Sequence, residues 1–169
     1  MPRYDLPNAA PEPLRLVQRF VNTLDHEHGR EWIGTPAELS EWLGAPLGAD
    51  DLPRAHELRE SLRALLRANN GAPLDADAVT TLGRAAGRLR LELDSRARVT
   101  IVGDDALDRI VAVAVGAMLD GSWRRLKACR NCWWAFYDYS RNRSASWCSM
   151  QLCGNRLKTR AYRRRRARA

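Results

Sequence analysis

Apolar and polar positions in the first two thirds of the chain repeat with the period of amphipathic helices. The first such segment has one apolar face, formed by Leu14, Val17, Phe20, Val21 and Leu24. The same spacing predicts a longer helix over residues 53–69 and another helix that opens at Pro73 or Asp75. We expect the apolar faces of these helices to pack into one shared core.

Two more helices are indicated by the residues at which they begin. Thr35 can cap a helix in which Pro36 takes the first position and Glu38 completes a capping box. Gly44 then suits the end of that helix, because glycine tolerates the left-handed conformation found there. An aspartate at position 104 or 105 can cap a last, strongly apolar helix that ends near residue 121.

The period changes to two between residues 89 and 102. Leu89, Leu91 and Leu93 alternate with charged residues, and Val99 and Ile101 alternate with polar ones after a short connection. This alternation predicts a β-hairpin. The first 121 residues therefore predict a mainly α domain that carries one small hairpin.

No segment of the chain suggests a membrane protein or a secreted one. The longest apolar run covers residues 110–119, half of the roughly 20 residues that a membrane-spanning helix needs. The first ten residues lack the apolar core of a secretion signal. We therefore expect a cytoplasmic protein, in which structural disulfides are uncommon.

Charge divides the chain into two unlike parts. The net charge of +8 combines 14 basic and 19 acidic side chains in residues 1–120 with 14 basic and one acidic in residues 121–169. The first part thus carries −5 and the second +13. Such an asymmetry indicates a polyanionic partner, such as a nucleic acid, for the second part alone.

All four cysteines lie in the basic part. Cys129 and Cys132 are separated by two residues, Cys148 and Cys153 by four, and 15 residues lie between the pairs. These spacings are typical of a four-cysteine zinc site, with all four thiolates around one ion. A redox pair at Cys129 and Cys132, or chance free thiols, would leave the second pair unexplained.

A small basic segment with few aliphatic residues needs a metal or disulfides to fold. We therefore predict one structural Zn²⁺ and a division into residues 1–121, a helical domain able to fold by itself, and residues 122–169, a four-cysteine zinc finger. The finger is expected to combine a short β-hairpin with a basic C-terminal helix. The fold class is accordingly mainly α, with a small β-hairpin in the helical domain.

Nothing in the sequence favours an enzyme. A closed site of four thiolates has no open position at which a metal-bound water could be activated. Asp25, His26, Glu27 and His28 could bind metal but are consecutive, so we interpret them as a solvated helix end. No phosphate loop, activated nucleophile or convergent carboxylate pair is present, so no catalytic residue is predicted.

Aromatic residues lie between the two cysteine pairs. Most residues of the segment 133–139 are aromatic, and Trp147 precedes the second pair. Such aromatics more often form the minimal core of a finger than stack on bases, although some could do both. Asp138, the only acidic residue of the basic part, is expected to orient Arg141, Arg143 or a turn amide.

The residues after Cys153 predict a basic helix that Asn155 can cap. Such a helix could enter a major groove or follow phosphates, whereas the last arginines could equally form a solvated tail. The residues predicted to contact nucleic acid are Arg141, Asn142, Arg143, Asn155, Arg156, Lys158, Arg160, Arg163, Arg164, Arg165 and Arg166.

These motifs resemble two known families. Cys129-x-x-Cys132, the Phe-x-Asp-x-Ser-Arg-Asn motif at 136–142 and the segment 147–156, which ends in Cys-Gly-Asn-Arg, are similar to the CGNR zinc finger. The segments 19–25 and 35–43 resemble the opening of the ABATE domain, which usually precedes that finger. One difference is the Trp-Trp pair at 133–134, where many relatives have a glycine-containing knuckle.

The resemblance implies a bacterial transcription regulator, sometimes described as stress-induced. Its finger would bind DNA, in duplex form, while its helical domain would sense a small-molecule signal or form a homodimer. The resemblance identifies no ligand-binding residue in that domain. Asn22, Thr23 and Asp25 match a recurrent segment, but they could equally cap or hydrogen-bond within the fold. An RNA- or ribosome-associated protein and a protein-interaction adaptor remain alternatives, because exposed aromatics beside arginines suit single strands.

Overall fold

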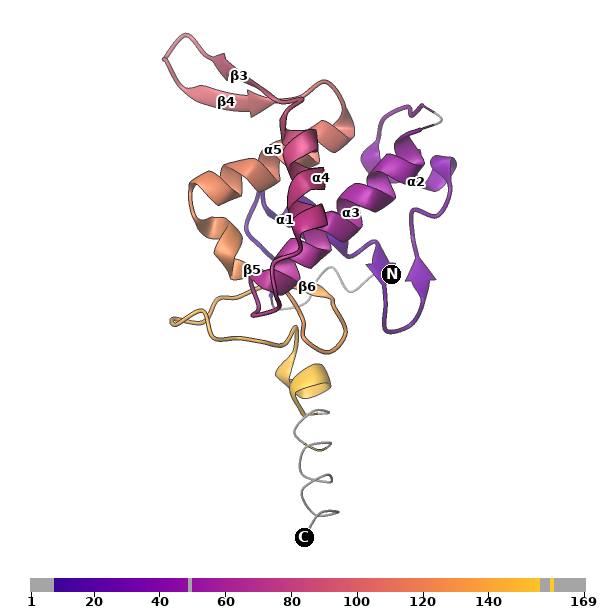
Figure 1. Cartoon of the computed structure of the whole chain (residues 1–169), viewed down its shortest axis with the longest axis vertical. Helices are drawn as coiled ribbons and strands as arrows, with labels where there is room; N and C mark the ends of the chain where they lie inside the picture. Colours follow the sequence, from indigo (N-terminus) through magenta and orange to yellow (C-terminus); the bar gives the residue numbers. More distant parts are fainter. Residues whose placement is uncertain (1–7, 49, 156–158, 160–169) are drawn as a thin grey trace.

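A computed structural model describes residues 8–48, 50–155 and 159 of the chain (Figure 1). Helices dominate its first two thirds, and the three small sheets are two-stranded, antiparallel and separate. The helices are α1 (Arg15–Val21), α2 (Pro36–Leu43), α3 (Asp51–Ala68), α4 (Ala76–Ala86) and α5 (Ala106–Leu119). The strands are β1 (Leu24–Asp25), β2 (Arg30–Glu31), β3 (Arg90–Leu93), β4 (Val99–Val102), β5 (Leu126–Ala128) and β6 (Ala135–Tyr137). The predicted mainly α fold class is confirmed.

The predicted helix starts are confirmed at atomic detail. The Thr35 hydroxyl accepts a hydrogen bond from the Glu38 amide at 3.3 Å, and the Glu38 carboxylate accepts one from the Thr35 amide at 2.9 Å. Gly44 ends α2 with φ of +66°. Asp75 and Asp105 cap α4 and α5 through their side chains. Local capping chemistry therefore determines where these helices begin.

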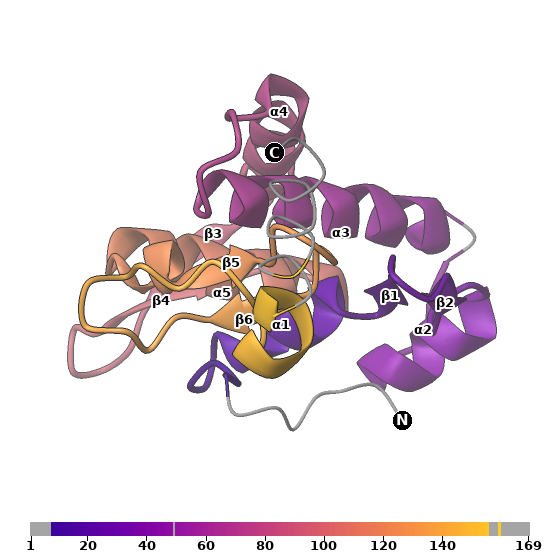
Figure 2. The same ribbon diagram turned by 90° about the horizontal axis from the view of Figure 1, so that it is seen from below.

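The main hydrophobic core is assembled around α3, which packs against α1, α4 and β5. Figures 1 and 2 show α3 crossing the middle of the molecule with α4 packed against it. The largest side chains that are almost fully buried in this core include Phe20, Ile33, Leu62, Leu66 and Ile110. The core thus uses the apolar faces that the 3.6-residue period predicts.

The predicted β3–β4 hairpin is present but lies largely outside this core. Its register pairs Leu91 with Ile101 and Leu93 with Val99. Leu91 and Leu93 nevertheless remain about 70% exposed. In Figure 1 the hairpin projects from one end of the molecule, opposite the end that carries β5 and β6. The alternating pattern therefore predicted the strands but not their burial.

The main core continues into the cysteine-containing part of the chain. Leu126 and Ala128 of β5 and Ala135 and Tyr137 of β6 are buried in the same cluster as the side chains of α1, α3 and α5. The core is thus continuous across residue 121, where the sequence places the boundary between the two parts. The division into residues 1–121 and 122–169 remains a prediction.

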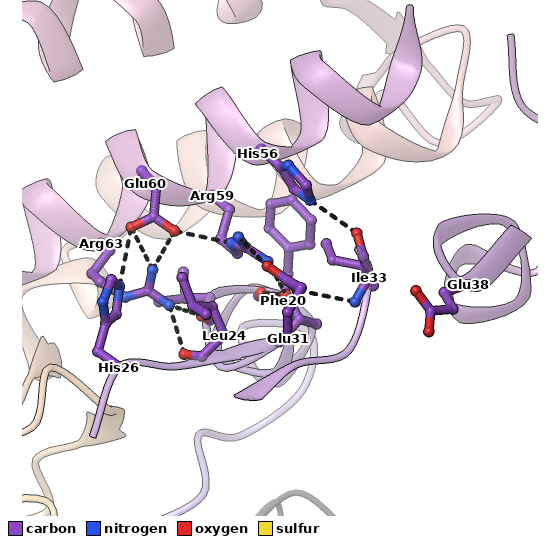
Figure 3. A network of polar contacts seen from close by, with 12 residues as sticks. Phe20, Leu24, His26, Glu31, Ile33, Glu38, His56, Arg59, Glu60 and Arg63 are labelled. Carbon is purple, nitrogen blue, oxygen red and sulfur yellow. Dashed lines mark hydrogen bonds and ion pairs between the residues drawn. The ribbon is translucent and has the colours of Figure 1, made fainter. Parts of the chain in front are cut away.

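Two buried arginines of α3 attach the β1–β2 hairpin to the core (Figure 3). The Arg59 guanidinium donates to both carboxylate oxygens of Glu31 at 2.7 Å and to Glu60 at 3.0 Å. Arg63 donates to Glu60 and to the carbonyl oxygens of Val21 and Leu24. Burial of these charges is partly compensated, because both guanidinium groups have carboxylate partners, Arg59 also donates to the Thr23 hydroxyl, and Arg63 lacks a partner among the described residues only at Nε.

The structure also bears on the apolar run at residues 110–119. This run lies within α5, and Ile110, Val111, Ala114 and Ala117 are buried in the main core. Within residues 8–48, 50–155 and 159, no helix is long and apolar enough to cross a membrane.

Candidate metal centre and nucleic-acid interface

The first cysteine pair lies in the tight connection between β5 and β6. The Cys129 amide donates a hydrogen bond to the Trp134 carbonyl oxygen at 2.9 Å, and the Trp133 amide donates one to the Cys129 carbonyl oxygen at 3.0 Å. Trp133 has φ of +61°, in the left-handed region that favours glycine. This reversal turns Cys129 and Cys132 toward the same point.

The second cysteine pair closes the site from a separate segment. Cys148 precedes a short π-helix, Met150–Gly154, and Cys153 lies within it. The Cys153 amide donates to the Ser149 carbonyl oxygen at 3.0 Å, which bends the chain back toward Cys148. In addition, the Asn131 side-chain amide lies 3.6 Å from the Cys153 sulfur, as expected of a group that supports a thiolate ligand.

The four sulfur atoms have the spacing of a tetrahedral zinc site. All four Sγ atoms lie within 4.8 Å of one another. Three of the Sγ–Sγ distances are 3.6 Å (Cys132–Cys148), 3.7 Å (Cys148–Cys153) and 3.5 Å (Cys153–Cys132). Ligands about 2.3 Å from a central Zn²⁺ stand roughly 3.8 Å apart, whereas a disulfide needs about 2.05 Å. The residues therefore fit the ion, and the chain has a site for one structural zinc.

Electrostatics lead to the same conclusion. Hydrogen bonds from the Cys132 and Cys148 thiols hold the pKa of Cys129 far below its usual range. Donating these hydrogen bonds to the Cys129 sulfur favours the protonated forms of Cys132 and Cys148. The hydrogen bonds and burial therefore raise the pKa values of these two thiols. Cys129, Cys132 and Cys148 thus cannot all ionise in this buried site unless a cation lies among them.

A second hydrophobic cluster encloses these sulfurs. Trp134 and Phe136 are buried within it, which confirms that these two aromatics form the core of the finger. Trp32, at the end of the β1–β2 hairpin, packs against the same cluster. Trp133 and Tyr139 are 38% and 59% exposed. These two remain accessible to a partner.

Asp138 has a different partner from the arginines that the sequence suggests. Its carboxylate accepts a hydrogen bond from Lys127 Nζ at 2.7 Å, and both side chains are buried. It also accepts from the amides of Ser140 and Ala145, as predicted for a turn amide. Of the predicted alternatives, the turn amide is confirmed, whereas the charged partner is the buried Lys127 rather than the exposed Arg141 or Arg143.

Lys127 also determines the shape of the segment that follows. Its ammonium donates to the carbonyl oxygens of Arg143 and Ala145 at 2.6 and 3.1 Å. Burial opposes ionisation of Asp138, but the hydrogen bonds from Lys127 and Ser140 outweigh it and lower the pKa of Asp138. This role of Lys127 was not predicted from the sequence. The signal was that Asp138, the only acidic residue of the basic part, needs a cationic partner, and Lys127 is the first lysine there.

The loop held by this pair presents three of the predicted contact residues. Arg141, Asn142 and Arg143 are all exposed, and Arg143 has φ of +51°. Arg125 braces the loop by donating to the carbonyl oxygens of Asp138 and Ser140 at 2.9 and 3.0 Å. The structure thus gathers these three polar side chains on one rigid, solvent-facing turn.

The remaining predicted contacts fall near or beyond the end of the described chain. Asn155 is exposed but already lies in helical backbone that continues from the π-helix, so the predicted N-cap at this position is wrong. The predicted contact residues that lie outside the described part of the chain are Arg156, Lys158, Arg160, Arg163, Arg164, Arg165 and Arg166.

Comparison with known families matches both parts of the chain. Residues 125–166 match the family model of the CGNR zinc finger, and residues 14–121 match the ABATE model, described as "Putative stress-induced transcription regulator". The second match covers more than half of the chain. The chain belongs to the ABATE family. No curated protein matches the chain. The two family descriptions are regulatory and zinc-binding, and neither is enzymatic.

The recurrent segment of the ABATE region serves the fold. The Asn22 side chain donates to the Ala135 carbonyl oxygen at 2.9 Å and accepts from the Ala135 amide at 2.7 Å. It therefore pairs with one residue of β6 as a neighbouring strand would. Thr23 hydrogen-bonds to Phe20 and Arg59, and Asp25 accepts from the amides of the next turn. These residues hydrogen-bond within the fold.

The metal-capable residues 25–28 also differ from their prediction. They lie in β1 and the turn after it rather than at a solvated helix end. Asp25 is buried and accepts from the His28 ring at 2.7 Å. The His26 ring packs against the Trp133 indole with a centroid distance of 4.9 Å, and His26 lies 3.4 Å from Glu60. This turn of the ABATE region therefore contacts the zinc knuckle.

Proposed function

We propose that this ABATE-family chain is a zinc-dependent DNA-binding transcription regulator of the cytoplasm. The observation that carries the proposal is the rigid turn of residues 138–145, which presents Arg141, Asn142 and Arg143 beside a buried cluster of four cysteines. Arginine and asparagine can read guanine and adenine edges through paired hydrogen bonds. A turn fixed in advance loses little conformational entropy on binding, so it suits specific recognition.

The charge of the basic part supports a polyanionic partner. Four thiolates and one Zn²⁺ together add about −2, which leaves residues 121–169 near +11. The contact surface that we propose adds Asn155, Arg156, Lys158, Arg160 and the arginines at 163–166 to the turn. Residues 122–169 would act as the finger, while residues 1–121 would receive a signal or mediate assembly.

A salt titration tests DNA binding by the full, zinc-loaded chain. If six to ten phosphates are neutralised, the affinity for a labelled duplex should fall by about 10³ to 10⁵ between 50 and 200 mM salt. Replacing Arg141 and Arg143 by Gln should reduce the slope of log K against log salt by about 2. The matched control, Arg96→Gln with Arg98→Gln, removes the same charge from the far hairpin and should leave the slope unchanged. A flat salt response by the unsubstituted chain would refute the proposal and favour a protein-interaction adaptor.

A second candidate is an RNA-binding protein, which is favoured by the exposure of Trp133 and Tyr139 near arginines. Single strands offer unstacked bases to such side chains, whereas a duplex does not. Competition at fixed salt between duplex DNA and single-stranded RNA of equal length separates the two. We expect the duplex to compete more strongly; stronger competition by RNA would favour the second candidate.

The proposed role of the ABATE region in sensing or assembly is supported by its family description, which names stress-induced regulation. A homodimer would place two fingers on one DNA and favour a site with two halves. Sedimentation of the zinc-loaded protein tests homodimer formation, because the measured mass should be twice the 19.1 kDa of one chain. Sedimentation at 19.1 kDa, both free and on DNA, would leave a small-molecule signal as the proposed role.

A further inference from the structure

A basic cavity lies where the C-terminal end of α3 meets the zinc knuckle. It has a volume of about 280 Å³, and its lining includes Arg67, Asn70, Arg130 and Trp133. Cys129, one of the zinc ligands, forms part of its wall. The cavity therefore joins the ABATE region to the metal centre.

The two arginines of this cavity are held in place by groups that do not neutralise them. The Arg67 guanidinium carbon stands 4.5 Å from the Trp133 ring centroid, stacked over the indole. Arg130 Nε donates to the Asn70 carbonyl oxygen at 2.8 Å. Within the described part of the chain, no carboxylate forms an ion pair with either arginine. The cavity thus concentrates two positive charges whose remaining N–H groups are available for an anion.

The backbone around the cavity is shaped to fit Arg130. Gly71 has φ of +90°, and a Cβ built there would lie 2.8 Å from an Nη atom of Arg130. Only glycine therefore allows both the turn after α3 and the position of this guanidinium. Trp133 has a comparable role, because its left-handed backbone places the indole under Arg67 and beside His26. Trp133 therefore acts as a platform for the guanidinium, while 38% of its surface stays exposed.

Hydrogen bonds connect the cavity to the turn that presents Arg141–Arg143. The Asn70 side chain donates to the carbonyl oxygens of Ala128 and Ser146 at 2.8 and 3.0 Å. The Arg130 amide donates to the same Ser146 oxygen at 3.3 Å. Ser146 directly follows the turn. The cavity and the proposed DNA-binding turn are therefore linked by hydrogen bonds to the same residue, Ser146.

We infer that Arg67 and Arg130 bind a phosphate of the nucleic-acid backbone, so that the ABATE region itself contributes to the interface. This inference rests on the proposed function and extends it beyond residues 125–166, the range of the finger. A phosphate matches the cavity because its oxygens accept several hydrogen bonds from planar guanidinium groups. Phosphate contacts of this kind position a protein on DNA without reading sequence.

The test compares salt slopes of duplex binding for the full, zinc-loaded chain and single-charge variants. Arg67→Gln should lower the slope of log K against log salt by about 0.9, the value for one phosphate. Arg67→Lys keeps the charge and should largely preserve the slope. Arg96→Gln removes one exposed arginine from the far hairpin and should not change the slope. Zinc content and melting temperature are measured for each variant, so that a loss of fold is recognised.

The outcomes separate this inference from the proposed function. A slope that drops in Arg67→Gln and is restored in Arg67→Lys supports a phosphate at Arg67. Salt-dependent binding by the unsubstituted chain, with the same slope in Arg67→Gln, would overturn the inference and leave the proposed function intact. An equal drop in Arg67→Gln and Arg67→Lys would also overturn it, because loss of the stacked guanidinium rather than of charge would then be responsible. A flat salt response of the unsubstituted chain would overturn both.

Discussion

At the residue scale, the buried pair of Lys127 and Asp138 explains why the finger presents a defined turn. The lysine reaches the Asp138 carboxylate and two carbonyl oxygens of the turn, and both side chains are almost fully buried. Taking one partner away leaves the other charge desolvated and uncompensated. The pair is therefore a sensitive point of the finger, whereas the exposed arginines of the turn are free to contact a partner.

The cost of breaking this pair can be measured directly. We expect Lys127→Met to lower the free energy of unfolding of the zinc-loaded chain by about 3 kcal/mol, because Asp138 remains buried and charged. The control, Arg98→Met, breaks the exposed Arg98–Asp94 pair and should cost far less, because water screens that pair. Denaturant titration measures both changes, and equal costs would contradict the burial of the Lys127 pair.

A pH-dependent prediction concerns Glu31 and Arg59. Burial disfavours the ionised Glu31, but hydrogen bonds from Arg59 and Ile33 lower its pKa below the usual glutamate value of about 4.3. Ionised Glu31 thus stabilises the fold at neutral pH, and this contribution is lost as the pH falls through its lowered pKa. We expect Glu31→Gln to cost about 2–3 kcal/mol at pH 7 and progressively less below pH of about 4. A pH-independent difference from the unsubstituted chain would contradict this assignment.

At the scale of elements, local signals account for most of the secondary structure. The capping residues Thr35, Asp75 and Asp105 and the helix end at Gly44 were all predictable, because a cap depends on residues within one turn. The cysteine spacing was equally informative, since one tetrahedral ion restricts it. By contrast, Asn22 and Asn70 could not be assigned, because their partners lie 113 and 58 or more positions away. The local periodicity of the sequence carries no information about such long-range contacts.

Asn22 offers a test of how α1 is joined to β6. In Asn22→Ala the Ala135 carbonyl oxygen keeps the Gln18 side chain as donor at 3.1 Å, but the buried Ala135 amide loses its acceptor. We therefore expect a loss of about 2 kcal/mol in unfolding free energy. The exposed Asn142→Ala should change it by less than about 0.5 kcal/mol. Similar values for the two variants would show that the Asn22 contact does not support the junction.

At the scale of the whole molecule, the finger and the helices share one core. The sequence predicts that the helical part folds by itself, because its helices can bury a common apolar face. In the structure, Leu126, Ala128 and Ala135 also lie in that core, and Trp32 packs against the zinc cluster. The two parts differ clearly in charge and composition, yet residues of both are buried in the same core. Composition alone does not predict which residues are buried.

Metal removal tests this shared core. A zinc concentration about 1,000 times the dissociation constant stabilises the folded chain by about 4 kcal/mol. Chelation should therefore lower a single melting transition of the whole chain by roughly 10 °C, because loss of the zinc loosens β5 and β6 within the core. Circular dichroism follows the helices, and tryptophan fluorescence follows the finger. Helices that melt at an unchanged temperature while the fluorescence signal is lost would contradict a shared core.

The most direct test of a zinc-dependent, sequence-specific regulator is selection from a random duplex DNA library. The full, zinc-loaded chain would be incubated with the library, and bound fragments would be sequenced beside those retained after chelation. We expect one recurring sequence to be enriched with zinc and none without it, because the Arg141–Arg143 turn can read base edges only when the finger is folded. Uniform recovery of all sequences by the zinc-loaded chain would contradict specific recognition.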